Sequence, residues 1–327
     1  MNDHPPLVFA IGATRAFGER VVAALDLRLG RHEERLFEDG EQKTRPLESV
    51  RERDVYVIHS LCADAVESAN DKLVKLLLFV GALRDASAAR VTAVLPYLAY
   101  ARKDRKSKPR DPVATRYVAQ LFEAVGADRV VTVDVHNLAA FQNAFRCRTE
   151  HLEAAWLFVR HFTCERGTRP FAVVSPDAGG IQRAEAFRAR MEATLGEPVP
   201  LGFAEKHRSA GVVSGEAFVG EVAGRTSIIV DDLISSGTTV LRTARTCRSH
   251  GATSVCVVAT HAVFGTGANE ALADEAIDRI VVTDTVSGER LVAPGAVAKL
   301  ERVSVAGLLA EAIRRLHNGG SVAELML

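Results

Sequence analysis

The stretch 228–239 constrains the fold of this chain more than any other part of its sequence. Residues 228–230 (Ile-Ile-Val) are apolar on both faces of an extended segment, as in a strand buried between two layers of helices. Asp231 and Asp232 follow directly, then the small polar loop 235–239, and apolar residues at 240–247 recur at the spacing of a helix. A strand, an acid pair, a loop and a helix in this order predict an open α/β sheet, in which ligands bind beyond the carboxyl ends of the strands.

The loop of this stretch has the chemistry of an anion site. Backbone N–H groups and hydroxyls at the start of a helix favour a phosphate, and Gly237 lets the backbone approach it closely. The two carboxylates before the loop can accept hydrogen bonds from two vicinal hydroxyls. A phosphate and a nearby diol occur together in a ribose 5-phosphate, for which the predicted site consists of Asp231, Asp232, Ser235, Ser236, Gly237, Thr238 and Thr239. The alternative is an ordinary turn in which the Asp and Ser side chains cap the helix.

Composition restricts the classes of partner and the compartment. The 327 residues suggest about two domains. Basic and acidic residues number 41 each, and this zero net charge disfavours a nucleic-acid partner. The cysteines are scattered without a C-x-x-C pair, which indicates reduced thiols in the cytoplasm. We expect neither a signal peptide nor a membrane partner, because no basic start precedes an apolar run and no apolar stretch reaches membrane length.

Apolar strands and helical patterns alternate in both halves of the chain, which predicts an α/β fold of parallel sheets flanked by helices. The expected strands are 7–11, 55–60, 91–96, 130–135, 171–175, 227–231, 255–260 and 280–283. The expected helices are 17–27, 68–84, 112–125, 156–161, 180–194, 239–250 and 304–317. The boundary is expected near 150–168, which gives domains 1–155 and 156–303. The last helix should pack back on a sheet, with that of the first domain as the candidate.

A cation-rich loop follows the strand that ends at residue 96. Its basic residues are Arg102, Lys103, Arg105 and Lys106. Because they follow a strand end, they could neutralise a polyphosphate. The alternative is a solvated charged loop, which is the usual interpretation of a run of charges.

Two further strand ends carry candidate ligands of metal or phosphate. Asp134 and His136 alternate onto one face at the end of the strand 130–135, although a lone His is most often structural. Behind the strand 171–175, Gly179 and Gly180 free backbone N–H groups for an anion, and Asp177 could hold a hydrated Mg²⁺ ion. A plain helix start is the alternative for this second segment.

Two polar segments indicate no chemistry when taken singly. The segment 205–211 (Glu-Lys-His-Arg-Ser-Ala-Gly) is turn-like, and its simplest interpretation is a surface loop. The segment 36–41 predicts an exposed tight turn around Gly40.

In their order along the chain, these segments resemble those of the ribose-phosphate pyrophosphokinases, the PRPP synthetases, over about residues 7–316. The stretch 228–239 is similar to the ribose-phosphate loop of the phosphoribosyltransferase-type fold. The other matching patterns are F-x-D-G-E at 37–41, P-Y-x-x-Y-A-R-x-D-R at 96–105, T-V-D-x-H at 132–136, S-P-D-x-G-G-x-x-R at 175–183 and a counterpart of D-K-R-R at 205–208. The resemblance implies two similar phosphoribosyltransferase-like domains, each a parallel sheet flanked by helices.

The resemblance also implies roles for the matching residues. Those expected to bind ATP are Phe37, Asp39, Glu41, Arg102 and Asp104, with the segment 37–41 reaching a neighbouring subunit's site. Those expected at the metal are His136 and Asp177, and those of the pyrophosphate loop are Gly179, Gly180 and Arg183. Lys206 and Arg208 are expected to act at the transferring phosphates.

The activity that the resemblance implies is transfer of the diphosphoryl group of ATP to the 1-hydroxyl of ribose 5-phosphate, which gives PRPP and AMP. Its implied cofactor is Mg²⁺, and its implied assembly is a homo-oligomer, either a dimer or a hexamer. Two alternatives remain: a phosphoribosyltransferase that consumes PRPP at the same loop, and a catalytically silent regulatory homologue. The ATP-like segments 37–41 and 102–104 argue against the first, and the presence of Lys206 and the acid pair argues against the second.

Overall fold

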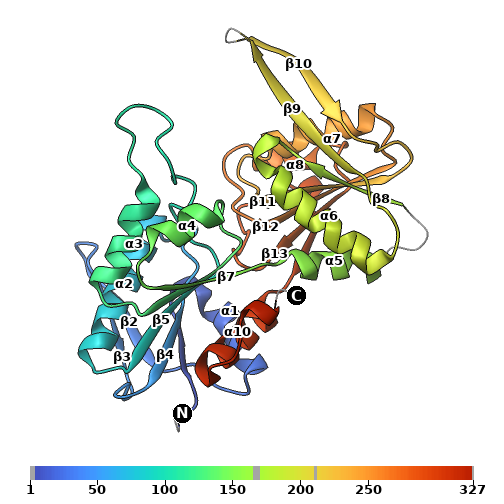
Figure 1. Cartoon of the computed structure of the whole chain (residues 1–327). Coiled ribbons are helices and arrows are strands. Elements are labelled where there is room, and N and C mark those ends of the chain that lie inside the picture. The colour runs from blue at the N-terminus through green and yellow to red at the C-terminus, as the bar shows by residue number, and fades with distance from the viewer. Residues whose placement is uncertain (1–3, 165–169, 210–211, 326–327) are drawn as a thin grey trace. The chain divides into compact units, whose positions relative to one another are not determined.

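The structure is a computed structural model that describes residues 4–164, 170–209 and 212–325, without the side chains of residues 205–217. The chain divides into two compact units, unit 1 with residues 1–153 and 305–327 and unit 2 with residues 154–304 (Figure 1). Each unit is built on a sheet of mainly parallel strands with helices packed against it, so the predicted fold class is confirmed. No helix in the described part of the chain combines the length and the apolarity needed to cross a bilayer.

The sheet of unit 1 has five parallel strands in the order β1-β4-β5-β6-β7. The strands are β1 (Leu7–Ala10), β4 (Asp54–Ile58), β5 (Arg90–Leu95), β6 (Arg129–Val133) and β7 (Arg148–Leu152). Every residue of β1 and β4 is buried, which explains why these strands are continuous apolar runs rather than alternating ones. Because the strands are parallel, their carboxyl ends and the loops that follow share one edge of the sheet.

Helices cover both faces of the unit 1 sheet (Figure 1). The helices are α1 (Arg15–Ala24), α2 (Ala69–Asp85), α3 (Ala114–Ala124), α4 (Leu138–Ala144) and α10 (Ala306–Asn318). Phe9 and Val57 pack into one core with the apolar residues of α2 and α3. Successive strand residues face opposite ways, so Ala10 lies on the other face, where a Cβ on Gly18 of α1 would come within 2.2 Å of it. The C-terminal helix α10 lies beside α1.

A separate antiparallel hairpin of unit 1 consists of β2 (His32–Leu36) and β3 (Gln42–Pro46). Its strand β3 packs against α2. The predicted exposed turn at 36–41 is confirmed as the tip of this hairpin. The two strands were not predicted, because their sequences, His-Glu-Glu-Arg-Leu and Gln-Lys-Thr-Arg-Pro, lack the apolar alternation of a half-buried strand.

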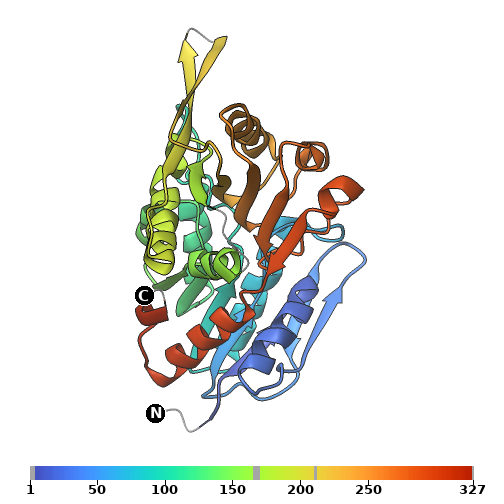
Figure 2. The same ribbon diagram turned by 90° about the vertical axis from the view of Figure 1, so that its right-hand side faces the viewer.

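The sheet of unit 2 has seven strands in the order β10-β9-β8-β11-β12-β13-β14. The strands are β8 (Phe171–Ser175), β9 (Leu201–Ser209), β10 (Val212–Val219), β11 (Thr226–Leu233), β12 (Ser254–His261), β13 (Arg279–Thr283) and β14 (Leu300–Val303). All neighbours are parallel except β9 and β10. The predicted parallel sheet therefore needs one correction, the antiparallel strand β10 at this edge. The β9–β10 hairpin extends beyond the rest of unit 2 (Figure 2).

Two groups of helices pack on the unit 2 sheet. The helices are α5 (Ala155–Cys164), α6 (Ile181–Leu195), α7 (Thr238–Ser249), α8 (Ala268–Ala273) and α9 (Pro294–Val297). Ile229 and Val257 share a core with residues of α7 and α8. The helices α5 and α6 pack beside each other and contribute Phe158, Phe162 and Phe187 to the buried set.

The prediction of a surface loop at 205–211 is wrong for residues 205–209. Residues 205–209 continue β9 and pair with β10, with Lys206 opposite Glu216 and Arg208 opposite Val213. Ala210 and Gly211 lie outside the described residues. A polar run such as Glu-Lys-His-Arg-Ser gives no apolar alternation, so the strand could not be recognised from local sequence.

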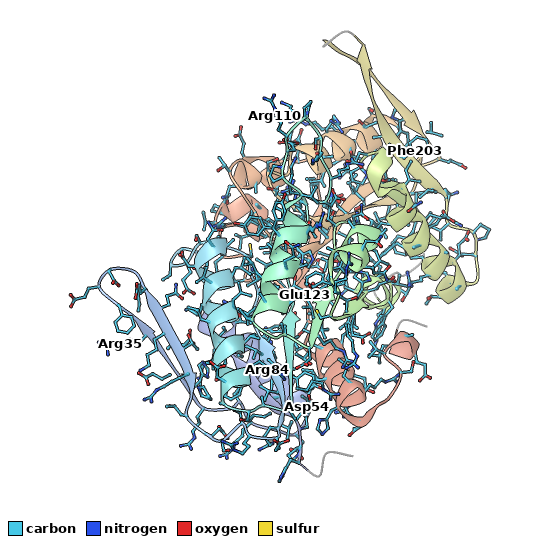
Figure 3. The ribbon with its side chains drawn as sticks, turned by 60° about the vertical axis from the view of Figure 1, so that its left-hand side comes forward. Arg35, Asp54, Arg84, Arg110, Glu123 and Phe203 are labelled. Atoms are coloured by element: carbon cyan, nitrogen blue, oxygen red, sulfur yellow. The ribbon has the colours of Figure 1, made fainter. Side chains whose placement is uncertain are left out.

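Asp54, labelled in Figure 3, joins α10 to the sheet of unit 1. Its side chain is fully buried and accepts hydrogen bonds from Arg90 Nε at 2.7 Å and Tyr56 Oη at 2.9 Å. Its Oδ2 also lies 2.8 Å from Nδ1 of His317 in α10. Burial opposes ionisation, but the hydrogen bonds from Arg90 and His317 hold the pKa of Asp54 below its usual value.

We predict that Asp54→Asn lowers the stability of unit 1 by about 3 kcal/mol, because it leaves the half-buried guanidinium of Arg90 without its carboxylate. Since the folded pKa of Asp54 is lowered, its contribution is complete above the usual pKa of about 4 and is lost as the pH falls through the folded value. Amide hydrogen exchange in β4 and β5 measures this stability separately from that of unit 2.

The matched control is Glu19→Gln, which removes an exposed pair with Arg15. Glu19→Gln should change the free energy of unfolding of unit 1 by less than about 0.5 kcal/mol. Equal effects of the two substitutions would contradict the structural role of Asp54.

Candidate active site

The carboxyl ends of β8, β11 and β12 lie side by side on one edge of unit 2, because these strands are parallel neighbours. The segments that leave this edge are 176–180, 234–237 and 262–267. Side chains at the starts of these segments therefore gather where open α/β sheets bind their ligands.

Asp231 and Asp232 lie within the last part of β11, which extends to Leu233, so the acid pair ends the strand rather than following it. Asp231 is in register with Ala259 of β12. The exposed fractions of the two side chains are 23% for Asp231 and 4% for Asp232. The N–H of Asp232 donates to Oδ1 of Asp231 at 2.8 Å. Two adjacent carboxyl groups are thus held largely out of water.

Arg183 of α6 faces both members of the acid pair. Its Nη1 lies 3.5 Å from Oδ1 of Asp231 and 3.4 Å from Oδ1 of Asp232. Burial and the neighbouring Asp232 carboxyl raise the pKa of Asp231 to about 8, and the charge of Arg183 only partly opposes this rise. The pair therefore retains a proton near neutral pH, and a cation or hydroxyl donors would favour its release. Such displaced pKa values are typical of functional sites.

The loop 235–239 leads from the acid pair into α7. Gly237 adopts a φ of +76°, and a Cβ there would come within 2.9 Å of Ala271, so a side chain does not fit. Ser236 Oγ lies 3.1 Å from Thr238 Oγ1 and 3.4 Å from the Thr238 N–H. The N-cap of α7 is Gly237, which has no side chain to bond the first turn, so the N–H groups beyond that of Thr238 can face an anion.

The segment 176–180 forms a second tight turn beside this loop. Asp177 Oδ1 accepts a hydrogen bond from the N–H of Gly180 at 3.0 Å and so caps the short helix η2 (Ala178–Gly180) before α6. A Cβ on Gly180 would lie 2.8 Å from Ser175 Oγ, so the turn needs glycine there. Thr243 of α7 donates to the carbonyl oxygen of Pro176 at 3.4 Å. The structure therefore brings the predicted pyrophosphate and ribose-phosphate loops together in unit 2.

In unit 1 the predicted ATP segment after β5 meets the turn after β6. Asn137 Nδ2 donates to Asp104 Oδ2 at 2.7 Å. The predicted alternation of Asp134 and His136 on a strand is wrong, because β6 ends at Val133 and Asp134 has a φ of +39°. That left-handed residue turns the chain and places His136 in an exposed position next to Asn137.

The rest of the cationic loop is organised by Asp111, which sequence reasoning missed. Its Oδ2 accepts hydrogen bonds from Lys103 Nζ at 2.6 Å, from the Ser107 N–H at 3.0 Å and from the Lys108 N–H at 2.9 Å. Lys103 is thus engaged within the loop, whereas Arg102 is exposed. Asn137 was missed as well. Its position directly after His136, and that of Asp111 directly after a cationic run, were the only sequence signals.

The hairpin β2–β3 presents the predicted adenine-binding residues at its tip. Phe37, Asp39 and Glu41 are all exposed there. Asp39 Oδ1 accepts from the N–H of Glu41 at 3.1 Å, and Gly40 closes the turn with a φ of +89°. The guanidinium of Arg35, labelled in Figure 3, lies 4.7 Å from the ring centroid of Phe37. The tip therefore offers an aromatic face and two carboxylates.

Lys206 and Arg208 have their backbone in β9, but their side chains lie outside the described part of the structure. Their predicted catalytic roles stay predictions on sequence grounds.

The fold and these loops define the class of the protein: an α/β protein of the phosphoribosyltransferase type, with a loop of hydroxyl residues and glycine behind an acid pair. A sequence model of the N-terminal domain of ribose phosphate pyrophosphokinase matches residues 7–126, and one of a phosphoribosyl synthetase-associated domain matches residues 205–327.

Full-length relatives narrow this class. The ribose-phosphate pyrophosphokinase of Caldanaerobacter subterraneus subsp. tengcongensis is 37% identical over 97% of this chain and 96% of its own length. That of Granulibacter bethesdensis is 38% identical over 97% of this chain and 99% of its own. The crystal structure of phosphoribosylpyrophosphate synthetase from Mycobacterium smegmatis matches with a TM-score of 0.86 and 34% identity, over 97% of this chain and 100% of that one. The chain belongs to the ribose-phosphate pyrophosphokinase family.

We predict that Asp232→Asn makes unit 2 more stable than the wild type at pH 8, and less markedly so at pH 5. In the wild type the folded state binds the Asp231 proton more tightly than the unfolded chain does, so stability falls as the pH rises from about 4 to 8. Removing the like charge lowers the pKa of Asp231, and each unit of that change is worth about 1.4 kcal/mol. Fluorescence of Trp156, the sole tryptophan of the chain, reports the unfolding of unit 2.

Glu221→Gln is the control, because Glu221 is exposed and its ion pair with Arg225 is long, at 4.0 Å. A stability difference between Asp232→Asn and wild type that does not change with pH would show that the two carboxyls do not interact.

Proposed function

We propose that the carboxyl edge of unit 2 binds ribose 5-phosphate for a diphosphoryl transfer from ATP, the reaction of the family to which the chain belongs. The single observation that carries this assignment is the acid pair of β11, largely buried beside Arg183 and followed by the glycine N-cap of α7. The products are PRPP and AMP.

The two ends of the sugar phosphate match the two parts of this edge. Ser235, Ser236, Thr238 and Thr239 supply hydroxyls, and with Gly237 they lead into the first N–H groups of α7, which suit the 5-phosphate. Asp231 and Asp232 accept hydrogen bonds from the 2- and 3-hydroxyls, or hold a metal ion that coordinates the hydroxyl oxygens. The loop with Gly179, Gly180 and Arg183 is assigned to the transferring diphosphoryl group. Arg183 supports this assignment because its guanidinium already lies beside the acid pair.

ATP is assigned to residues of unit 1. The exposed ring of Phe37 offers a stacking face for adenine, and Asp39 and Glu41 offer hydrogen-bond acceptors beside it. Arg102 and Asp104 are assigned to the nucleotide as well, with Asp104 oriented by Asn137.

The residues present fit Mg²⁺ as the cofactor. Asp177 uses Oδ1 for its cap, and a carboxylate oxygen is the ligand type that Mg²⁺ prefers. His136 of unit 1 is proposed as a contact of a separate metal position at the nucleotide phosphates. No three His, Cys, Asp or Glu side chains among the described residues converge on a metal position, so the ion would take most ligands from phosphates and water. Bound there, Mg²⁺ would neutralise phosphate charge.

The protein needs little covalent chemistry for this reaction, because phosphoryl-type transfer depends on positioning and charge neutralisation. Residues of the acid pair fix the ribose so that its 1-hydroxyl can attack the β-phosphorus of ATP, and the bond to the α-phosphate oxygen breaks to release AMP. Lys206 and Arg208 are proposed to balance the charge that develops on the transferring group. We place the reaction in the cytoplasm, in keeping with five free cysteines.

The direct test mixes the protein with Mg²⁺, ATP and ribose 5-phosphate and follows AMP and PRPP, omitting each component in turn. The proposal expects AMP only when all three are present. AMP formation at the same rate without ribose 5-phosphate would contradict the proposal. A protein that binds both substrates without turnover would be the silent homologue, and one that instead consumes PRPP with a base would be the phosphoribosyltransferase.

We predict that Lys206→Ala lowers kcat by about 10²–10³-fold, with much smaller changes in both KM values. The reason is that charge on the transferring group peaks in the transition state, where removing one such donor costs roughly 2.7–4 kcal/mol. Steady-state kinetics measure the split, with His207→Ala as the control at the neighbouring position. A kcat equal to that of the wild type in the Lys206→Ala protein would show that Lys206 has no catalytic role.

We predict further that the active unit is a homo-oligomer, a dimer or a hexamer, in which the hairpin tip of one subunit serves the ATP site of another. Phe37→Ala and Asp104→Ala proteins should each be nearly inactive, but their mixture should recover part of the activity after subunit exchange, because some sites then receive both intact residues. Mixing each variant with itself is the control. A fully active monomer in light scattering would refute the shared site.

A further inference from the structure

The β2–β3 hairpin of unit 1 cannot set its own direction. It is a two-stranded ribbon, which alone is marginally stable in water, and its tip is exposed, with Leu36 at 69%. The residues proposed to contact adenine all lie at that tip. Whatever holds the base of the hairpin to unit 1 therefore decides where the tip points.

Glu34 of β2 makes a polar connection of this kind, in addition to the packing of β3 on α2. Its carboxylate accepts the N–H of Gly12 at 2.9 Å and 3.1 Å, and it lies 3.0 Å from His32 Nε2 and 3.1 Å from Lys75 Nζ. Gly12 opens the turn η1 (Gly12–Thr14) after β1, and Lys75 belongs to α2. One carboxylate thus joins the hairpin to two elements of the unit. Burial opposes its ionisation, but hydrogen bonds from His32, Gly12 and Lys75 lower the pKa of Glu34 to about 2.

The charged ammonium group of Lys75 stabilises the attachment of Glu34 to α2. The Lys75 side chain is only 11% exposed, and Nζ lies 2.5 Å from Glu67 Oε1 besides its contact with Glu34. The Glu34 side chain is 27% exposed, and a partly buried carboxylate that loses its cation is destabilised. No Cβ could be added at Gly12 without crowding, because it would lie 3.2 Å from Glu67 Oε2, and the φ of +57° already favours glycine.

Two neighbouring basic groups, Lys72 and His59, cannot replace Lys75. Lys72 is engaged by Asp64 Oδ2 at 2.7 Å and by the Cys62 carbonyl oxygen at 2.7 Å. His59 is fully buried, and burial together with the charges of Lys72 and Lys75 lowers its pKa to about 3, so it stays neutral.

The other ion pairs of the hairpin have a different geometry. Lys43 Nζ lies 3.6 Å from Glu33 Oε1, and Arg45 Nε lies 2.6 Å from Glu33 Oε2. These pairs join β2 only to β3, and the basic side chains are 41% and 56% exposed. They can strengthen the ribbon but cannot fix its direction, which makes Lys43 the natural control.

We propose that Lys75 is a positioning residue for ATP: by holding Glu34 of the hairpin to α2 and to the turn after β1, it sets the direction of the tip that carries Phe37, Asp39 and Glu41. This inference rests on the proposed role of the tip in binding adenine. Lys75 itself touches no substrate, and it acts through Glu34.

The experiment compares Lys75→Met, Lys75→Arg, Glu34→Gln and Lys43→Met in the full-length protein. We expect Lys75→Met to raise KM for ATP by about tenfold or more, with KM for ribose 5-phosphate unchanged and a smaller change in kcat. Glu34→Gln, which keeps the shape of the side chain, should shift KM for ATP in the same direction. Lys75→Arg should restore most of the affinity, and Lys43→Met should behave as wild type.

Hydrogen exchange gives a readout that does not depend on activity. Amides of residues 33–45 should exchange faster in Lys75→Met, whereas those of β1, β4 and β5 should keep their protection. Unchanged exchange in the hairpin would overturn the proposal. Faster exchange throughout unit 1, with kcat and both KM values affected alike, would also overturn it in favour of a purely structural role.

The two proposals fail in different ways. If the wild type forms no AMP, the proposed function fails, while the exchange measurement still tests whether Lys75 holds the hairpin. If the wild type is active and the hairpin of Lys75→Met loosens without any change in KM for ATP, the positioning role fails and the activity stands.

Discussion

The candidate site of unit 2 depends on the placement of two adjacent carboxyl groups, Asp231 and Asp232, at the end of a strand buried on both faces. Parallel pairing of β8, β11 and β12 puts the ends of these strands on one edge, so the side chains and loops that follow must meet there. Burial and mutual repulsion raise the pKa of Asp231 to about 8, and Arg183 offsets this only partly. The folded protein therefore tolerates an unfavourable charge arrangement at the position where a hydroxyl-rich ligand or a cation would relieve it.

The charges of unit 1 are arranged in the opposite way. Asp54 receives hydrogen bonds from three side chains, and Glu34 is held by Gly12, His32 and Lys75, so both carboxylates are favourably ionised. Asp54 fastens the C-terminal helix to the sheet, and Glu34 fastens the hairpin. Strongly paired carboxylates thus serve as attachments in this unit, whereas the poorly paired carboxyls of unit 2 lie at the proposed ligand site. The same residue type has opposite effects because its partners differ.

Local sequence predicted the strands that are continuous apolar runs, such as β1 and β4, and the helices whose apolar residues recur, such as α2 and α10, because their burial leaves a pattern within a few residues. It failed for β2, β3 and β9, whose polar sequences have no such pattern. Individual motifs indicated the predicted ribose-phosphate and pyrophosphate loops, since the residues of each are neighbours in the chain. The contacts of Arg183 with the acid pair, of Asn137 with Asp104 and of Lys75 with Glu34 join distant segments, so only the packed structure reveals them.

The central claim is that the acid pair meets the ribose, and the proton that it retains offers a direct measurement. Calorimetric titration of ribose 5-phosphate with Mg²⁺ at pH 7.5, in buffers of different ionisation enthalpy, counts the protons exchanged on binding. The account predicts net proton release by the wild type, because donors or a metal at the carboxylates favour their ionised form, and a smaller release with weaker binding by Asp232→Asn. Equal affinity and equal proton exchange in the two proteins would contradict it.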